Sequence, residues 1–212
     1  PISHFHPISL NTLTYQKSIS TLKMWMHPTS TALTLCEYFE REKISFAGKK
    51  VIELGSGSGI VGILAVLLGG DVTFTDRTFI LKQIEHNIVA NIPSSCKGSA
   101  KVCALSWGED QTKFLSEYDV ILGSDIVYCL SSYPSLLKTL LHLSQPETTI
   151  YIAWQMWPRN TYNIFFRDML PKHFHLQLVD ENINEYIYVY KLTKKQSFVG
   201  DQPADSVDVV VV

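Results

Sequence analysis

The residues with the clearest chemical potential lie in a glycine-rich segment, VIELGSGSGIVGILAVLLGGDVTFTD, which runs from Val51 to Asp76. Gly55, Gly57 and Gly59 stand there between a β-like run and a helix-like run. Glycine costs conformational entropy, so its use at such a boundary indicates a geometric need, such as a ligand that approaches the backbone closely. Asp76 ends the next strand-like run, where a carboxylate can bond the hydroxyls of a ribose. The segment therefore predicts a site for a ribose-bearing ligand.

Two cofactor patterns overlap in this segment. Residues 57–62 fit G-x-G-x-x-G, the fingerprint of dinucleotide sites. Residues 53–59 fit E-x-G-x-G-x-G, the pattern of S-adenosylmethionine-dependent methyltransferases. An acid at the strand end, Glu53, suits a cationic ligand and would repel the pyrophosphate that a dinucleotide presents to a helix N-terminus. Glu53 therefore favours S-adenosylmethionine, while a dinucleotide and a tight turn without a ligand stay open as alternatives.

Other candidate residues follow the third and fourth strand-like runs. Trp107 lies in LSWG, and Asp125 and Tyr128 lie in GSDIVY. Because ligands of doubly wound sheets bind at the carboxyl ends of the strands, Trp107 is placed to line an adenine pocket. Asp125 and Tyr128 are placed at the rim where a transferred methyl group would emerge. The structural alternatives are a core tryptophan for Trp107 and a helix-capping acid for Asp125.

Two other kinds of chemistry lack their residues. The segment 55–59 is the nearest match to the G-x-S-x-G turn of serine hydrolases, but Gly57 holds the place of the nucleophile. The four cysteines form no CxxC pair, and none stands at zinc-ligand spacing from a histidine. We therefore expect neither a serine hydrolase nor a metal site.

The elements that must position these residues follow from the hydrophobic periodicity of the chain. Helical spacing covers residues 29–41, 60–68, 78–90, 133–143 and 162–170. Strand-like runs cover residues 50–54, 71–75, 101–105, 118–122, 148–153, 173–179 and 186–192. This order predicts an α/β fold with a mostly parallel sheet between helices. The last two strands have no helix between them, so we expect a hairpin in which at least one strand is antiparallel to the others.

Composition limits the function classes further. With 212 residues, of which 46% are hydrophobic and 18% charged, the chain can form one α/β domain with a large core. A formal net charge of −2 gives no strong electrostatic attraction to nucleic acid or to an anionic membrane. No signal peptide is visible, and the longest apolar run, residues 60–68, is too short to span a bilayer. We expect a cytosolic or nuclear protein with an arm over residues 1–28, a domain over 29–195 and a disordered tail over 196–212.

The combination of FAGKKVIELGSGSGIVGILAVLLGGDVTFTD, LSWG and DVILGSDIVY resembles the seven-strand, Rossmann-like protein lysine methyltransferases of eukaryotes. Within them it is most similar to the methyltransferase-like 21 group, and there to the elongation factor 1A lysine methyltransferases. The resemblance implies a class I methyltransferase fold and S-adenosyl-L-methionine as cofactor, with S-adenosyl-L-homocysteine as product. It also implies methylation of elongation factor 1A or a heat-shock chaperone, and we expect a monomer that acts in the cytoplasm.

The resemblance also assigns roles to residues. It implies cofactor contacts by Gly55, Ser56, Gly57, Asp76, Trp107 and Ser124, and we add Glu53 and Gly59 of the glycine-rich segment. Asp125 and Tyr128 match the Asp-x-x-Tyr motif of the family and are assigned to catalysis, where they hold the target lysine and shape the rim. The lysine must be neutral to attack, and a rim that excludes water lowers the pKa of its ammonium.

One position departs from the family pattern. The family usually carries a tryptophan just before its first helix, in a run that closes over the cofactor, and spacing from Gly55 puts that position at Thr29. The nearby tryptophan is Trp25, four residues earlier, and we assign it to the cofactor site. The departure supports an alternative function, a non-catalytic binding module that has the methyltransferase fold and an altered cofactor lid.

Overall fold

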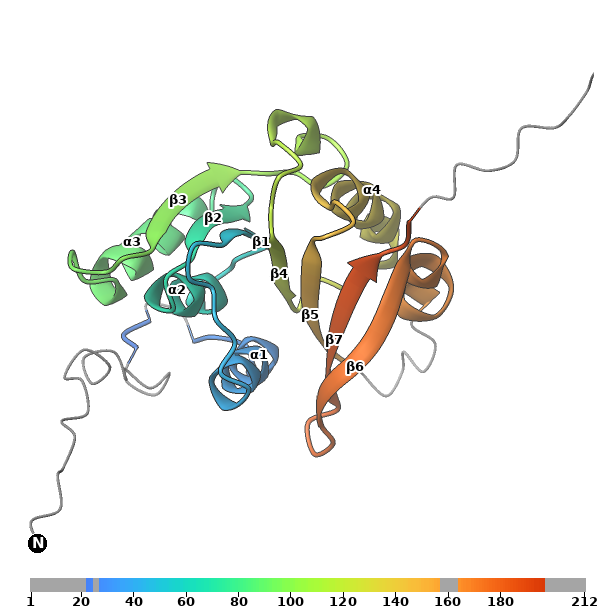
Figure 1. Ribbon diagram of the computed structural model, residues 1–212, viewed down its shortest axis with the longest axis horizontal. Coiled ribbons are helices and arrows are strands. Elements are labelled where there is room, and N and C mark those ends of the chain that lie inside the picture. The colour runs from blue at the N-terminus through green and yellow to red at the C-terminus, as the bar shows by residue number, and fades with distance from the viewer. Residues whose placement is uncertain (1–21, 25–26, 157–163, 197–212) are drawn as a thin grey trace, which may run out of the picture.

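The computed structural model describes residues 22–24, 27–156 and 164–196 of the chain (Figure 1). Trp25, most of the expected N-terminal arm and nearly all of the expected tail lie outside the described residues. The expected arm, domain and tail boundaries therefore stay predictions.

One sheet organises the described residues. Its seven strands have the order β3-β2-β1-β4-β5-β7-β6. The strands are β1 (Lys50–Leu54), β2 (Asp71–Asp76), β3 (Ser99–Ala104), β4 (Val120–Ser124), β5 (Thr149–Gln155), β6 (Phe174–Asn182) and β7 (Ile187–Lys194). Pairs from β3 to β5 are parallel, whereas β7 is antiparallel to both β5 and β6. The predicted α/β fold with a mostly parallel, seven-stranded sheet and a C-terminal antiparallel hairpin strand is confirmed.

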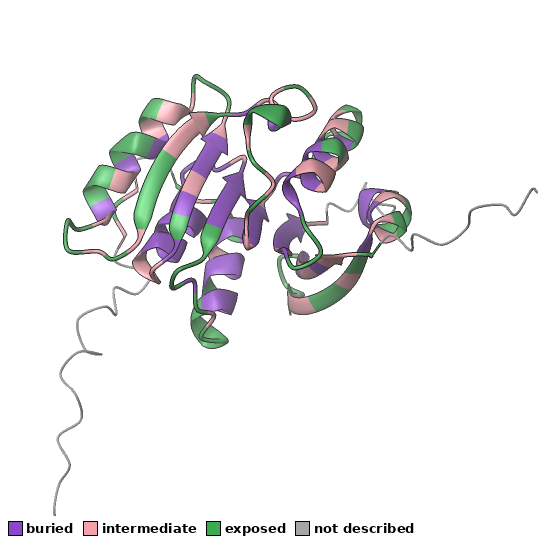
Figure 2. Ribbon diagram, turned by 45° about the horizontal axis from the view of Figure 1, so that its top comes forward, coloured by how far each residue is buried: buried purple, intermediate pink, exposed green. Residues whose placement is uncertain are grey.

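Helices cover both faces of this sheet (Figure 1). They are α1 (Ser30–Arg41), α2 (Ile60–Leu67), α3 (Leu81–Asn91) and α4 (Tyr133–Leu143), with short turns η2 (Gln111–Lys113), η3 (Leu130–Ser132), η4 (Phe165–Met169) and η5 (Leu170–Lys172). Alternate residues of β1 face opposite layers. Val51 belongs to the hydrophobic cluster that includes residues of α1, α2 and α3, while Ile52 and Leu54 belong to the cluster that includes residues of α4 and η4. Because both faces are covered, the central strands are buried, as Figure 2 shows.

The order of the strands creates the place for a ligand. From β1 the chain passes through α2 to β2 on one side, and it later returns to β4 on the other side of β1. The carboxyl ends of β1 and β4 thus lie at a topological switch point, where the connecting loops part and leave a crevice. The glycine-rich segment follows β1, and Asp125 follows β4, so both stand at this crevice.

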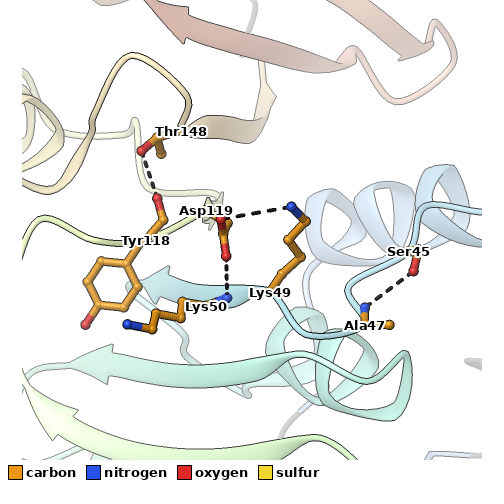
Figure 3. Close-up of polar contacts among 7 residues, drawn as sticks. All are labelled: Ser45, Ala47, Lys49, Lys50, Tyr118, Asp119 and Thr148. Atoms are coloured by element: carbon orange, nitrogen blue, oxygen red, sulfur yellow. Dashed lines mark hydrogen bonds and ion pairs between the residues drawn. The ribbon is translucent and has the colours of Figure 1, made fainter.

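Polar contacts fix the opposite, amino edge of the same strands (Figure 3). Asp119 accepts a hydrogen bond from the amide of Lys50 at 2.8 Å, and its other carboxylate oxygen lies 4.0 Å from the ammonium of Lys49. The hydroxyl of Thr148 donates to the carbonyl of Tyr118 at 2.8 Å. These contacts tie the starts of β1, β4 and β5 together, and so they set the register that brings their other ends to the crevice.

The boundaries of several elements differ from the predicted ones. The helix expected over 78–90 begins at Leu81, because residues 77–80 first form a turn in which the amide of Ile80 bonds the carbonyl of Arg77. The described part of the helix expected over 162–170 is a π-helical turn, η4, followed by the 3-10 turn η5. Two consecutive phenylalanines of this turn, Phe165 and Phe166, are both buried.

Candidate active site

A cleft of about 510 Å³ opens at the carboxyl edge of the sheet. Among the predicted site residues, Gly55, Asp76, Trp107, Asp125 and Tyr128 line it. They stand at or just after the carboxyl ends of four strands, so the fold gathers residues that lie far apart in the sequence. The volume lies within the roughly 300–1,000 Å³ typical of sites for small molecules and cofactors.

The glycine loop, residues 55–59, has an unusual backbone. Gly55, Gly57 and Gly59 have φ values of 61°, 53° and 77°, in the left-handed region. At Gly55 an added Cβ would lie 2.9 Å from Cγ2 of Ile126 and 3.2 Å from Cζ2 of Trp107, so a side chain would displace the floor of the cleft. Gly55 is therefore required both by its φ and by this close approach.

Ser56 is buried and serves the shape of the loop. Its amide donates to the carbonyl of Thr75 at 3.0 Å, and its hydroxyl accepts from the amide of Thr75 at 3.1 Å. These bonds fasten the loop to the end of β2. Ser56, Gly57 and Gly59 do not line the cleft, and their assignment to the cofactor stays a prediction.

Asp76 is held by the backbone around it. One carboxylate oxygen accepts from the amide of Gly57 at 2.9 Å, and the other accepts from the amide of Arg77 at 2.7 Å. A carboxylate oxygen has more than one acceptor site, so each oxygen can accept a further hydrogen bond from a ligand hydroxyl. The side chain is oriented before any ligand binds, as a ribose-binding acid requires.

Trp107 combines the two roles that its sequence context left open. The half-buried ring packs against the core cluster that contains Ile126, and it also lines the cleft beside Gly55. The next residue, Gly108, donates its amide to the hydroxyl of Thr139 on α4 at 2.9 Å. This bond anchors the loop after β3, so the ring can form a fixed wall of the cleft.

Asp125 has a left-handed backbone, with φ of 59°, which is uncommon outside glycine. Its amide donates to the carbonyl of Ala153 at 3.0 Å, so pairing with β5 holds it in this conformation. Such strained residues cost about 1–3 kcal/mol and cluster at functional sites. Burial raises the pKa of its carboxyl. The alternative of a helix cap is wrong for α4, whose N-cap is Ser132.

Tyr128 and Ser124 flank Asp125 differently. Tyr128 lines the cleft and is 65% exposed, so it stands at the rim and can meet a substrate. Ser124 is the last residue of β4, pairs with Ala153 and does not line the cleft. Its predicted cofactor contact remains untested.

Glu53 lies beneath the glycine loop instead of in the cleft. It is 1% exposed, and within the described part of the chain its Oε2 atom has no hydrogen-bond partner. Desolvation raises the pKa of its carboxyl to about 8, although the hydroxyl of Ser56 and the amide of Gly62 act in the opposite direction. The side chain is therefore mainly neutral at pH 7. It would repel a pyrophosphate less than the charged carboxylate that the sequence leads us to expect. Its predicted contact with the cofactor stays a prediction.

The cleft is also lined by residues that the sequence motifs do not predict, among them Arg77, Ser106 and Cys129. Each stands next to a predicted residue in the chain, and that adjacency was the only available signal. Hydrogen bonds with Ser131 lower the pKa of the exposed Cys129 thiol. Among the described residues, no three His, Cys, Asp or Glu side chains are grouped closely enough to bind a metal ion.

Comparison with known proteins identifies the family of this site. A family model described as lysine methyltransferase matches residues 8–172, more than half of the chain. The chain belongs to the lysine methyltransferase family. EEF1A lysine methyltransferase 3 of Mus musculus is 55% identical over 159 residues, which cover 74% of this chain and 68% of the mouse protein. Protein N-lysine methyltransferase METTL21A of Danio rerio is 39% identical over 78% of this chain and 76% of its own length.

Solved structures place this lysine methyltransferase in the same fold. One is the magnesium protoporphyrin IX methyltransferase of Synechocystis, solved with S-adenosylhomocysteine, which is 10% identical to this chain and matches its structure with a TM-score of 0.59. The match covers 78% of this chain and 82% of the Synechocystis chain. The predicted family, its Rossmann-like methyltransferase fold, its enzyme class and S-adenosylmethionine as the family's cofactor are confirmed. In the described part of this lysine methyltransferase, no helix has both the length and the apolar character needed to cross a bilayer.

Proposed function

We propose that this chain transfers methyl groups from S-adenosylmethionine to a lysine of elongation factor 1A. The main support for this proposal is that one cleft is lined by two groups of residues. The first is Gly55, Asp76 and Trp107, and the second is Asp125 and Tyr128. The first group suits a nucleoside, and the second suits an amine that arrives at the rim. The name of the mouse relative supports elongation factor 1A as the substrate.

The residues present fit this cofactor. Asp76 presents carboxylate oxygens to ribose hydroxyls, Trp107 offers an aromatic wall, and Gly55 leaves the floor of the cleft free of a side chain. Next to Gly57, the space that a Cβ would face is open, which leaves room beside the loop. When bound, S-adenosylmethionine supplies an electrophilic methyl group.

The chain's own contribution to catalysis is mainly alignment. Asp125 is fixed by its bond to Ala153, so its half-buried carboxylate can accept a hydrogen bond from the lysine amine and direct it toward the cleft. Tyr128 stands exposed at the rim, where its ring can contact the incoming lysine side chain and exclude water when the substrate binds. Excluding water there favours the neutral amine, because desolvation disfavours an ammonium. Within the described residues we assign no separate strong base, and solvent takes the released proton.

Methylation of defined substrates tests the substrate assignment. The protein is incubated with tritiated S-adenosylmethionine and either purified elongation factor 1A or a purified heat-shock chaperone, and labelled peptides are mapped by mass spectrometry. We expect label on a lysine of elongation factor 1A. Label on the chaperone alone would contradict the substrate assignment. A protein that binds the cofactor but labels neither substrate nor any lysate protein would support the alternative of a non-catalytic binding module, which the departure at Thr29 favours.

The setting of the reaction belongs to the same proposal. We propose a monomer that acts in the cytoplasm, with the nucleus as a second location, and that has no nucleic-acid or membrane partner. The formal charge of −2 supports this view, since it gives the chain no strong attraction to polyanions. Size-exclusion chromatography with light scattering tests the monomer, and fractionation of cells tests the location.

A further inference from the structure

Helix α3 carries two asparagines that are almost completely buried. Asn87 is 0% exposed and Asn91 is 2% exposed, and they stand one turn apart on the helix. Burying a side-chain amide is costly unless its donors and acceptor find partners. The partners of these two amides therefore indicate why a polar pair is placed here.

Asn87 holds the glycine loop. Its Nδ2 donates to the carbonyl of Ser58 at 2.8 Å, and Ser58 lies between two glycines with left-handed backbones. One turn earlier on α3, Nε2 of Gln83 donates to the carbonyl of Gly57 at 3.2 Å. Two side-chain amides of α3 thus donate to the successive carbonyls of Gly57 and Ser58 and hold this part of the loop in place.

Asn91 holds a segment from the other end of the sequence. Its Oδ1 accepts from the amide of Lys23 at 2.7 Å, and its Nδ2 donates to the carbonyl of Lys23 at 2.8 Å. The side-chain amide therefore pairs with both backbone groups of one residue, as a neighbouring strand would. Leu22 and Met24 on either side pack against the core, so residues 22–24 are anchored to α3.

The two asparagines are also bonded to each other. Nδ2 of Asn91 donates to the backbone carbonyl of Asn87 at 2.8 Å, which uses the second hydrogen of the same amide. A continuous path of hydrogen bonds therefore runs from Lys23 through Asn91 and Asn87 to Ser58. No residue of this path lines the cleft.

We infer that Asn91 and Asn87 are positioning residues that couple the anchoring of residues 22–24 to the shape of the glycine loop, and thereby to cofactor affinity. The inference rests on the proposed function in one respect, that S-adenosylmethionine binds at this loop. Loss of the anchor loosens the last turn of α3, and the bond from Asn87 to Ser58 weakens with it. The loop must then be ordered when the cofactor binds, which lowers affinity.

Two variants of the exposed residue Lys23 separate the effect of its backbone bonds to Asn91 from the effect of its side chain. Lys23→Pro removes the amide that bonds Asn91, while Lys23→Ala removes only the side chain and keeps both backbone bonds. We expect Lys23→Pro and Asn91→Ala each to weaken binding of S-adenosylmethionine about fivefold to tenfold, as the loss of one or two hydrogen bonds would. Lys23→Ala should remain within twofold. Because both changes break the same path, the double variant should bind no more weakly than Asn91→Ala alone.

Calorimetry gives these dissociation constants at a temperature where circular dichroism shows every variant folded. Steady-state kinetics separates a loss of cofactor affinity from a general loss of active protein. In Lys23→Pro and Asn91→Ala, KM for the cofactor should rise while kcat at saturating cofactor is unchanged. In the cofactor-free protein, hydrogen exchange at the amides of residues 56–60 should quicken in Lys23→Pro and stay at the wild-type rate in Lys23→Ala.

Equal cofactor affinity in wild type, Lys23→Pro and Asn91→Ala would overturn the inference, and so would equal weakening by Lys23→Ala and Lys23→Pro. If the wild type binds no S-adenosylmethionine, the proposed function fails. Hydrogen exchange still decides the coupling in that case, since unchanged exchange at the loop in Lys23→Pro would refute it.

Discussion

At the scale of single residues, two acids predicted as site residues, Asp125 and Glu53, lie in different surroundings. Asp125 sits at the cleft, where strand pairing holds it in a left-handed conformation, and burial raises the pKa of its carboxyl. Glu53 lies under the glycine loop, where burial raises the pKa of its carboxyl to about 8. Their positions in the sequence predict both as site residues, but the sequence does not show how far each carboxyl is buried from solvent.

Glu53 should make the stability of the ligand-free protein depend on pH. Its folded pKa of about 8 lies above its ordinary value of 4.5, so between these values the folded state holds a proton that the unfolded state has lost. The free energy of unfolding should therefore fall as pH rises through this range, by up to about 1.4 kcal/mol per pH unit. Urea denaturation of wild type and Glu53→Gln between pH 5 and 8 measures it. The variant should lose this dependence, and parallel curves would refute the assignment.

Asp76 should contribute to cofactor binding with its carboxylate. Asp76→Ala removes a charged acceptor for ribose hydroxyls, so binding of S-adenosylmethionine should weaken by about 1.5–3 kcal/mol. Asp71→Ala is a matched control, because it removes the same charge from the exposed, opposite end of β2. Calorimetry on both variants decides the point. Unchanged affinity in Asp76→Ala would mean that the carboxylate only supports the loop amides of Gly57 and Arg77.

At the scale of elements, α1 shows why the departure at Thr29 matters. Thr29 is the N-cap of α1, and its hydroxyl accepts from the amide of Ala32 at 3.3 Å. The residue is exposed and brings no ring to the site. A tryptophan at this position, which the resemblance leads us to expect, would exchange a helix cap for an aromatic surface.

Thr29→Trp should therefore have two opposite effects. Loss of the cap should lower the free energy of unfolding by about 1 kcal/mol. The added ring should tighten cofactor binding relative to Thr29→Ala, which loses the cap without gaining a ring. Thermal denaturation and calorimetry on both variants separate the effects, and equal cofactor affinity in the two would show that the ring does not reach the cofactor.

Elements also differ in how well the sequence predicts them. Helices such as α4 were predicted residue by residue, because one apolar face and neighbouring turns define them. The start of α3 was not, since the turn bond from Ile80 to Arg77 leaves no mark in hydrophobic periodicity. The π-helical turn at Phe165 was not, since its buried residues Phe165 and Phe166 would be buried in the same way by an α-helix, so the apolar pattern does not distinguish the two. The roles of Asn87 and Asn91 on α3 cannot be predicted from the sequence, because their hydrogen-bond partners Ser58 and Lys23 lie far away in the chain.

At the scale of the whole molecule, the sheet is what makes a site from scattered motifs. The parallel order β3-β2-β1-β4-β5 brings the carboxyl ends of the strands to one edge, so that Gly55, Asp76, Trp107 and Asp125 meet in one cleft. This meeting was predictable from the strand order and the position of each motif. The shape of the cleft floor was not, because it depends on side chains such as Ile126 and Trp107, which lie so close to Gly55 that an added Cβ would meet them.

The proposed function depends most on Asp125, which we propose aligns a protein lysine for methylation in this cleft. The most direct measurement compares wild type with Asp125→Asn, which keeps the shape of the side chain and tolerates the left-handed backbone. Transfer of tritiated methyl to lysine is measured on the same samples as the dissociation constant of S-adenosylmethionine. Cofactor affinity should remain within a few-fold while transfer falls by about a hundredfold, as expected for a lost alignment. Methylation by Asp125→Asn at the wild-type rate would contradict the claim.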